Sequence, residues 1–440
     1  MRNTLYVRSK WKEPITQKYQ HGIIIGPLRL KRRCGIQHTL DTLFCRPRKP
    51  SPEMQSFLNI AVAVFAADKL VSRAEQSDGW TREIELSVPT SSSWNGLESV
   101  LQEALEFLSG DSWTLSFRDA APDVVARRYW KDQFVPDVVS LFSGGMDSLA
   151  GAIALLEQKK HVLLVSHHDF GFIAGRQREL ARLVAREYGS EQVRFAQYQV
   201  QVPDACEEST RARSILFIAL GLAVASSFGA TIPLVVPENG FIGINAPLTP
   251  SRIGSYSTRT THPFFFDLLS GALRQAGIAH ELENPFRFLT KGDILQQSPN
   301  KEFLLSVVSK TISCAHPVAA RWAGRAPENC GYCLPCLIRR ASLNVVERDN
   351  SNDYTFDALD DDSVLNSDRK GKDLRSLLIA IRRSATSKKP WLLEVLKSGS
   401  LGSLASEAKA LALVSTRGLQ EVERLIREKA CVSVRKYAGL

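Results

Sequence analysis

The sequence contains no apolar segment long enough to cross a membrane as a helix. Such a helix needs roughly 18 or more consecutive apolar residues, and the most apolar early run, residues 60–67, is much shorter. The first residues also lack the succession of basic, apolar and small residues that marks a secretion signal. We therefore expect a cytoplasmic protein that has no membrane partner.

Cysteine is scarce, and its distribution is uneven. Eight cysteines in 440 residues are too few for a disulfide framework. Four of them lie between Cys314 and Cys336, and this clustering indicates a metal site in a reducing compartment. The other four are scattered along the chain and are expected to be buried or idle thiols: Cys34, Cys45, Cys206 and Cys431.

A Walker A sequence is also absent, which argues against a P-loop NTPase. No internal repeat or low-complexity tract occurs. The net charge of +10 fits a nucleic-acid, nucleotide or acidic-protein partner, and it equally fits a basic protein with none of these. Because the basic residues form no long tract, nucleic acid stays an open alternative that no motif supports.

Residues 1–134 differ in pattern from the rest and predict a small α+β extension. Polar and apolar residues alternate over 80–88, which is typical of an edge strand. Residues 97–108 have the apolar spacing of an amphipathic helix, and 112–117 form another predicted strand. No residue in this N-terminal extension suggests a chemical role.

From residue 138 onward, short apolar strands alternate with helices. This alternation predicts a parallel, doubly wound α/β sheet. In such sheets ligands bind at the carboxyl ends of the strands, near the point where the strand order reverses. The predicted strands are 138–142, 161–166, 193–200 and 232–236, and the predicted helices are 147–158, 173–188 and 211–228.

We therefore expect residues 135–348 to form the core and residues 349–440 to form a C-terminal helical extension. The acidic stretch 350–368 predicts a linker or loop. Beyond it, apolar spacing predicts four helices, at 374–383, 391–396, 404–413 and 417–429.

One short segment joins the first strand of the core directly to its first helix: Ser143, Gly144, Gly145, Met146, Asp147 and Ser148. The two glycines remove side chains where phosphate oxygens would approach the backbone. The following helix points its amides and the positive end of its dipole at a bound anion. Ser143 and Ser148 can add hydroxyl donors. Asp147 can hold Mg²⁺, or it can simply serve the first turn of the helix, where aspartate is favoured.

This strand, loop and helix resemble the SGGxDS segment of the PP-loop ATP pyrophosphatases. The resemblance implies a PP-loop, HUP-like core that binds ATP with Mg²⁺ and cleaves it between the α and β phosphates. An oxygen of the substrate is adenylated and a nucleophile then displaces AMP. Because AMP leaves far more easily than oxide, a carboxylate becomes an acyl donor.

The clustered cysteines have the spacing of metal ligands. Cys330, Cys333 and Cys336 form two successive Cys-x-x-Cys steps, and Cys314 lies upstream. Thiolates at this spacing suit the tetrahedral Zn²⁺ of a zinc knuckle. His316 could replace Cys314 as a ligand, and an iron–sulfur cluster or a metal-free cluster could stand in place of the zinc site. Four thiolates leave no open coordination position, so a structural zinc is expected.

Together the loop and the cysteines resemble QueC, the 7-cyano-7-deazaguanine synthase family. The resemblance covers residues 137–345, and the segments 209–214 and 290–293 also match in order and approximate spacing. The chain departs from QueC in its large extensions, in a longer spacer before the last three cysteines, and in a loop around 237–263 without the acidic residues of QueC. These features are more similar to the QueC-like proteins of bacterial anti-phage operons, the QatC type.

The resemblance implies that Lys291 neutralises the departing pyrophosphate and acts in catalysis with Asp147 and Ser148. Arg213 opens a predicted helix, and Arg259 lies in a long polar loop of the kind that often carries function. Each arginine can contact phosphate or the substrate. A solvated surface side chain is the alternative for both.

Further candidates follow predicted strands, where ligands of such sheets bind. Glu238 and Asn239 follow one strand, and the Glu238 carboxylate either reads the N–H edge of a guanine-like base or caps the strand end. His167 and His168 follow another strand and lie near the adenine of ATP, or are ordinary strand-end residues. Arg211, like Arg213, either contacts phosphate or the substrate or is a solvated surface side chain.

We therefore expect ATP-dependent adenylation of a 7-deazaguanine carboxylate, with Mg²⁺ and Zn²⁺ bound, and transfer to an amine on a partner protein of a defence operon. A 7-cyano-7-deazaguanine synthase that uses ammonia is the first alternative. An inactive PP-loop scaffold in a defence complex is the second, and a zinc-ribbon nucleic-acid binder supported only by charge is the third.

Overall fold

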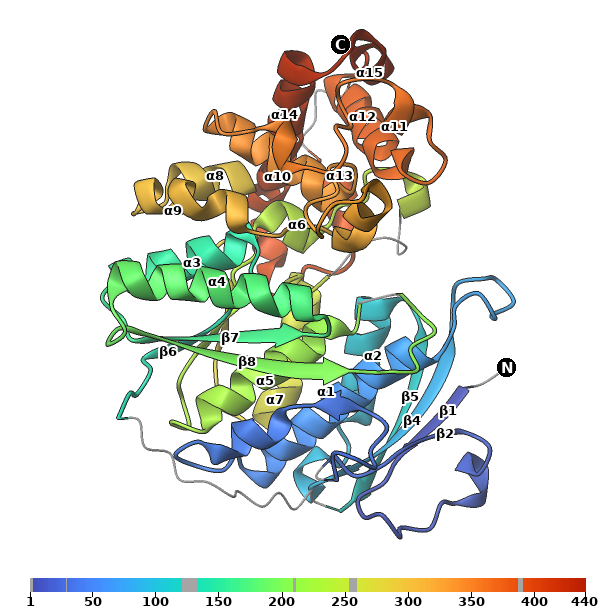
Figure 1. Cartoon of the computed structure of the whole chain (residues 1–440). Coiled ribbons are helices and arrows are strands. Elements are labelled where there is room, and N and C mark those ends of the chain that lie inside the picture. Colours follow the sequence, from blue (N-terminus) through green and yellow to red (C-terminus); the bar gives the residue numbers. More distant parts are fainter. Residues whose placement is uncertain (1–2, 29, 121–132, 209–210, 253–258, 387–390) are drawn as a thin grey trace.

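The computed structural model describes residues 3–28, 30–120, 133–208, 211–252, 259–386 and 391–440. It is a mixed α/β protein with two sheets and a group of C-terminal helices (Figure 1). The sheet formed by the N-terminal residues lies at one end of the molecule, the larger sheet lies in the middle, and the C-terminal helices lie at the other end. Residues 209–210 of the predicted arginine segment, and residues 253–258 of the polar loop before Arg259, lie outside the described residues.

The strands of the central sheet are β3 (Gln37–His38), β6 (Val138–Leu141), β7 (Val162–His168), β8 (Val193–Gln201), β9 (Leu234–Val235) and β10 (Leu282–Glu283). Their order is β10-β9-β6-β7-β8-β3, and only the β3–β8 pair is antiparallel. Leu141 at the end of β6 pairs with Val165 of β7. From β6 the chain moves outward to β8 and then crosses to β9, so the strand order reverses between β6 and β9.

Helices cover both faces of this sheet. The first face carries α1 (Pro52–Leu70), α5 (Arg213–Ser226) and α7 (Pro263–Gln275), and the second carries α3 (Met146–Glu157) and α4 (Gly171–Tyr188) (Figure 1). Val139 and Leu141 of β6 pack with the first group, whereas Val138 and the following Phe142 pack with the second. Successive strand residues point to opposite faces, so a strand that is buried along its whole length, as β6 is, needs helices on both. The predicted parallel α/β architecture is confirmed.

The second sheet contains four parallel strands in the order β2-β1-β4-β5, with α2 packed on it. Their bounds are β1 (Asn3–Val7), β2 (Ile23–Ile25), β4 (Glu83–Thr90), β5 (Ser112–Asp119) and α2 (Glu98–Ser109). The prediction of an edge strand at 80–88 is wrong, because β4 lies between β1 and β5 with seven of its eight residues buried. Polar residues of β4 that were expected to face solvent are hydrogen-bonded to buried groups instead. Glu85, for example, accepts a hydrogen bond from Tyr19 Oη at 2.8 Å.

The two sheets share one hydrophobic core. Helix α1 is buried along nearly its whole length because it packs against β4 on one side and α5 on the other. Strand β3, which precedes α1 in sequence, pairs with β8 at the edge of the central sheet. The apolar residues of the second sheet and of the first face of the central sheet therefore form a continuous cluster.

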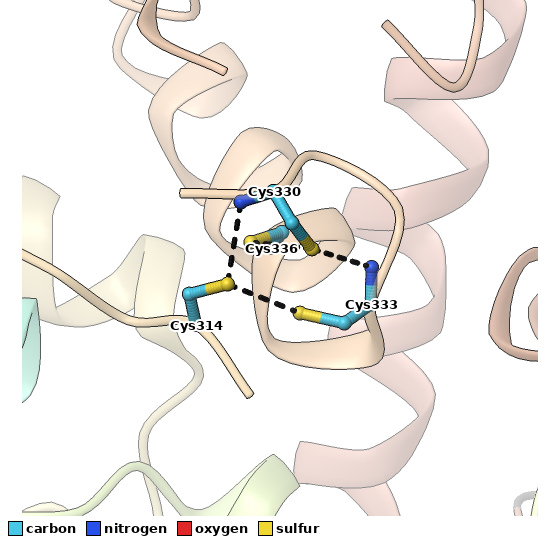
Figure 2. Close-up of side chains that lie close together, drawn as sticks. All are labelled: Cys314, Cys330, Cys333 and Cys336. Carbon is cyan, nitrogen blue, oxygen red and sulfur yellow. Dashed lines mark hydrogen bonds between the residues drawn. The ribbon is translucent and has the colours of Figure 1, made fainter. Parts of the chain in front are cut away.

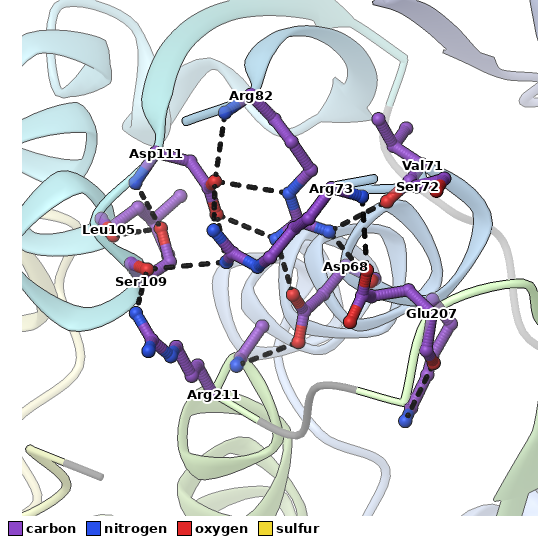
Figure 3. Close-up of polar contacts among 12 residues, drawn as sticks. Asp68, Val71, Ser72, Arg73, Arg82, Leu105, Ser109, Asp111, Glu207 and Arg211 are labelled. Atoms are coloured by element: carbon purple, nitrogen blue, oxygen red, sulfur yellow. Dashed lines mark hydrogen bonds and ion pairs between the residues drawn. The ribbon is translucent and has the colours of Figure 1, made fainter. Parts of the chain in front are cut away.

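A buried group of charged residues fixes the end of α1 against the start of α5 (Figure 3). Arg82 Nη2 lies 2.6 Å from Asp68 and 2.6 Å from Asp111, and Arg73 pairs with Asp111 at 2.8 Å. Asp68 Oδ2 also accepts a hydrogen bond from Ala212 N, at the start of α5, at 3.1 Å. Losing one partner of such a group leaves an uncompensated buried charge, so these contacts hold the N-terminal residues on the core.

The remaining helices either surround a second hydrophobic cluster or pack against α3 on the second face of the central sheet. They are α6 (Gly240–Ile244), α8 (Lys291–Gln296), α9 (Lys301–Val307), α10 (Leu334–Val345), α11 (Ser363–Asn366), α12 (Gly371–Thr386), α13 (Leu392–Lys397), α14 (Ala408–Lys429) and α15 (Val432–Ala438). None of the helices in the described ranges is long and apolar enough to cross a membrane.

Two predictions for the C-terminal extension need correction. The helices predicted at 404–413 and 417–429 are largely one helix, α14, since Ser415 and Thr416 donate their hydroxyls back to Leu411 O and Ala412 O instead of ending it. The acidic stretch predicted as a linker or loop is irregular over most of its length, but it also contains the short helix α11 and packs against the core through the ion pair of Asp357 with Arg340 at 2.5 Å.

Replacing Arg82 by methionine should destabilise the protein strongly. Asp68 and Asp111 would lose their shared buried partner, so we expect the free energy of unfolding in urea to fall by about 3–5 kcal/mol. Arg427→Met, which breaks an exposed pair with Glu423, is the control and should cost less than about 1 kcal/mol. Equal losses in the two variants would contradict a structural role for the buried group.

Candidate functional site

The loop 143–148 leads from β6 into α3 at the carboxyl edge of the central sheet. Gly144 has a φ of +84°, which favours glycine. Gly145 N donates to Ser143 Oγ at 3.2 Å, Ser143 Oγ donates to Ser148 Oγ at 3.3 Å, and Ser148 Oγ donates to Gly145 O at 2.9 Å. These bonds close the loop into a preformed turn directly before a helix start.

Asp147, in the first turn of α3, is held by two other elements. Lys291 Nζ lies 2.6 Å from Asp147 Oδ1, and the side chains are 4% and 11% exposed respectively. Asn239 donates to Asp147 Oδ2 through its side-chain nitrogen at 2.7 Å and its backbone nitrogen at 3.2 Å. Buried charges are stable only when paired and hydrogen-bonded, so these contacts fix the carboxylate and the ammonium together.

Local capping explains why Lys291 and Asn239 stand where they do. Thr290 and Asp293 form a capping box that starts α8 at Lys291. Asn239 is the N-cap of α6, and its Oδ1 accepts from Ile242 N at 3.0 Å. One oxygen of Asn239 therefore starts a helix while its nitrogen binds the loop carboxylate.

A second carboxylate, Glu238, lies next to Asn239. Thr261 Oγ1 donates to Glu238 at 2.5 Å, and burial raises the pKa of Glu238 to about 7. A cavity of about 110 Å³ borders Thr261 and Gly243, and it can hold a small group or several waters. A Cβ at Gly243 would lie 2.5 Å from Thr261 Oγ1, so the glycine permits the close approach of the threonine that donates to Glu238.

Arg213 is connected to the loop through two other residues. Its Nε donates to His167 Nδ1 at 3.3 Å, while Gln177 Nε2 donates to His167 O at 3.0 Å and to Ser143 O at 3.1 Å. Since His167 Nδ1 accepts, the proton lies on Nε2, which donates to Val200 O at 3.0 Å. Burial lowers the pKa of His167 well below its usual value, so this neutral, fully bonded ring is an ordinary strand-end histidine. A phosphate contact for Arg213 stays a prediction.

Arg259 and Arg211 contact the end of α2. Arg259 Nη1 donates to Phe107 O at 3.0 Å, and its guanidinium lies 4.4 Å from the centre of the Phe107 ring. Arg211 Nη1 donates to Ser109 O at 2.7 Å and its guanidinium lies 4.5 Å from the centre of the Trp80 ring. These contacts join the core to the N-terminal extension. The role of Arg259 as a phosphate ligand stays a prediction that its contacts do not support.

The four clustered cysteines converge on one point (Figure 2). The sulfurs of Cys314 and Cys333 are 3.9 Å apart, those of Cys330 and Cys336 are 3.9 Å apart, and all four lie within 4.8 Å of one another. A tetrahedral Zn²⁺ with Zn–S bonds of ~2.3 Å places its sulfurs about 3.8 Å apart. The four thiols are therefore compatible with zinc, and they lie closer together than thiolates that each bind a different iron of a cluster.

The surroundings of the thiols also suit a bound cation. Burial raises the pKa of the Cys336 thiol well above its usual value, so a thiolate at this position needs a nearby positive charge to form. Cys330 N donates to Cys314 Sγ at 3.2 Å (Figure 2). The alternative ligand His316 is not part of the group, since its ring stacks on Tyr332 with centroids 5.9 Å apart.

The cysteine cluster is joined directly to the loop. Ile312 N donates to Gly144 O at 3.0 Å, and Met146 N donates to Ser313 Oγ at 3.2 Å. Cys314 is the next residue of the same segment. If the segment that carries Cys314 became disordered, the loop would therefore lose two of its hydrogen bonds.

Two residues of the site were missed by the sequence predictions. Ser313 could have been found from its position beside a metal ligand. Glu421 of α14 accepts hydrogen bonds from Thr290 Oγ1 and Gly292 N at the start of α8. Nothing in the sequence around Glu421 distinguishes it from the polar face of an ordinary helix.

In comparisons with protein-family models, curated proteins and solved structures, the chain matches none. Its function is therefore argued from the site, because a fold alone does not determine a function. The site combines a preformed turn at a helix start, a buried lysine–carboxylate pair and four converging thiols.

The purified chain should contain one zinc ion bound by four sulfurs. X-ray absorption should give Zn–S distances of ~2.3 Å, and elemental analysis should show that Cys330→Ser loses the ion. Cys206→Ser, at an exposed cysteine outside the cluster, is the control and should keep it. Several irons per chain with acid-labile sulfide, or zinc that persists in the Cys330 variant, would contradict this assignment.

Proposed function

We propose that the chain is an ATP-dependent PP-loop enzyme of the QueC type that adenylates a 7-deazaguanine carboxylate and transfers it to an amine. The observation that supports this most is the buried pair of Lys291 and Asp147 beside a Gly-Gly turn at a helix start. It combines a fixed cation with a preformed anion site at the edge where α/β sheets bind ligands. The substrate class comes from the resemblance of the loop, the lysine and the cysteines to QueC.

The loop has the groups that a triphosphate needs. Backbone amides at the start of α3 and the ammonium of Lys291 would bind phosphate oxygens. The carboxylate of Asp147, which accepts bonds from Lys291 and Asn239, would also hold Mg²⁺. Bound there, Mg²⁺ would offset part of the negative charge of the phosphates.

The proposed reaction has two steps. A carboxylate oxygen of the substrate attacks the α phosphorus of the co-substrate ATP, and the bond to the β phosphate breaks, with Lys291 offsetting the charge of the pyrophosphate. An amine nitrogen then attacks the acyl carbon, loses a proton and displaces AMP. Glu238, whose pKa burial raises to about 7, would be the group that takes that proton near neutral pH.

The acceptor amine is proposed to belong to a partner protein of a bacterial anti-phage operon, as the QatC-type resemblance suggests. The zinc would be structural in this scheme, because four thiolates leave no position for a substrate. Its contribution would be to hold the segment of Ser313 against the loop.

With ATP and 7-carboxy-7-deazaguanine, the chain should release AMP and pyrophosphate in equal amounts. Asp147→Asn and Lys291→Met should each lower the rate by about 100-fold or more, because each removes a charge that acts on the phosphates. Nucleotide chromatography and a pyrophosphate assay measure both products. Asp78→Asn, in an exposed turn, is the control and should turn over at the wild-type rate.

Intact-mass analysis in the presence of the neighbouring operon proteins distinguishes the acceptors. A deazaguanine adduct on a partner protein supports amine transfer to a protein. Free nitrile formed from ammonia identifies the chain as a synthase instead. If AMP is released under none of these conditions, an inactive scaffold replaces the proposed enzyme.

A further inference from the structure

Helix α14 of the C-terminal extension packs on both elements that hold Asp147. It contacts α8, which begins with Lys291, and α6, which is capped by Asn239. Gly418 of α14 lies so close to the ring of Phe241 on α6 that any larger side chain would overlap it. Both partners of the loop carboxylate therefore rest against one helix that lies outside the central sheet.

Glu421 of α14 binds the residues on both sides of Lys291. One carboxylate oxygen accepts a hydrogen bond from Thr290 Oγ1, and the other accepts one from Gly292 N at 3.3 Å. A Cβ at Gly292 would lie 2.5 Å from Glu421 Oε1, so only glycine permits this approach. The residues before and after the lysine are thus bound by a single side chain.

Arg417, one turn earlier on α14, holds the same segment. It pairs with Asp293 at 3.1 Å and donates to Phe288 O at 2.9 Å. Asp293 is one half of the capping box that starts α8. Helix α14 therefore binds the segment before α8 and the first turn of α8 through two charged side chains.

We infer that Glu421 is a positioning residue through which the C-terminal extension sets the place of Lys291 in the candidate ATP site. The effect of Glu421 on catalysis rests on the proposed function, whereas its hydrogen bonds with Thr290 and Gly292 do not. The Nζ of Lys291 stands at the end of a long side chain, so its distance from Asp147 depends on where the backbone of residue 291 is fixed. Misplacement of a reacting group by about 1 Å can cost about 100-fold in rate.

The carboxylate of Glu421 is itself held by these contacts. The pKa of Glu421 is raised to about 7, chiefly by burial and also by nearby Asp293, against the opposing effect of the hydrogen bonds from Thr290 and Gly292 and of the charge of Arg417. A buried donor that loses its acceptor is costly. Truncation at position 421 would therefore leave two donors unpaired at the start of α8, and this segment would shift or loosen.

Three variants test the inference by steady-state kinetics. Glu421→Ala should lower the rate of AMP formation at saturating ATP by about 10- to 100-fold. Glu421→Gln should recover part of that loss, because its amide oxygen still accepts a hydrogen bond from Thr290 or Gly292. Glu423→Ala is the matched control on the same helix, where it removes an exposed pair with Arg427, and its rate should equal that of the wild type.

A double-variant cycle asks whether Glu421 acts through Lys291. In a Lys291→Met background, Glu421→Ala should have little further effect, because the group that it positions is already gone. If the two losses multiply instead, or if Glu423→Ala is as slow as Glu421→Ala, the inference is overturned.

Hydrogen exchange separates this inference from the proposed chemistry. Glu421→Ala should speed amide exchange in residues 288–296 by about tenfold or more relative to Glu423→Ala, whether or not ATP is consumed. Faster exchange together with a wild-type protein that forms no AMP would keep the positioning role of Glu421 and reject the proposed function. Unchanged exchange in this segment would reject the inference itself.

Discussion

The carboxylate of Asp147 is held from two sides, by the ammonium of Lys291 on one oxygen and by two nitrogens of Asn239 on the other. A buried charge with this many partners cannot lose one of them cheaply. The starts of α3, α6 and α8 are therefore fixed relative to one another by a single side chain. The remaining parts of the site, including the packing of α14 behind α6 and α8, depend on that arrangement.

The segment 312–314 supplies a second constraint on the same loop. Ile312 N and Ser313 Oγ bind the loop backbone, and Cys314 belongs to the thiol cluster. A metal bound by those thiols would therefore act on the loop mechanically, although it has no open position for a ligand. Zinc removal and damage to the loop should for this reason be difficult to separate experimentally.

Local patterns were sufficient to predict much of this architecture. The loop 143–148 was visible because its glycines, strand and helix are consecutive, and the thiol cluster because three of its members are three residues apart. The burial of β4 could not be predicted, since Glu85 looks exposed until Tyr19 is known to lie beside it. In the same way, Arg259 suggested a ligand contact until its partner, Phe107, was found 152 residues away.

Glu421 marks the limit of such predictions, because the partners that give it a role are about 130 residues distant in sequence. Asp68 is a parallel case, since it reaches from α1 to the backbone nitrogen at the start of α5. In both cases a carboxylate from an extension accepts a hydrogen bond at the start of a core helix. A negative charge at a helix start interacts favourably with the helix dipole, and this interaction typically contributes about 0.3–1 kcal/mol.

This energy is small, and the more important effect of each contact is that it fixes the position of a helix start. Helix α5 begins at Arg213, which donates to His167, and α8 begins at Lys291. The contacts of Asp68 and Glu421 therefore fix two helix starts that follow strands on opposite sides of β6, the strand that leads into the loop 143–148. Residues outside the central sheet thus help to determine where the side chains of the candidate site stand. The two extensions are better understood as part of the framework of the site than as separate modules attached to a self-sufficient core.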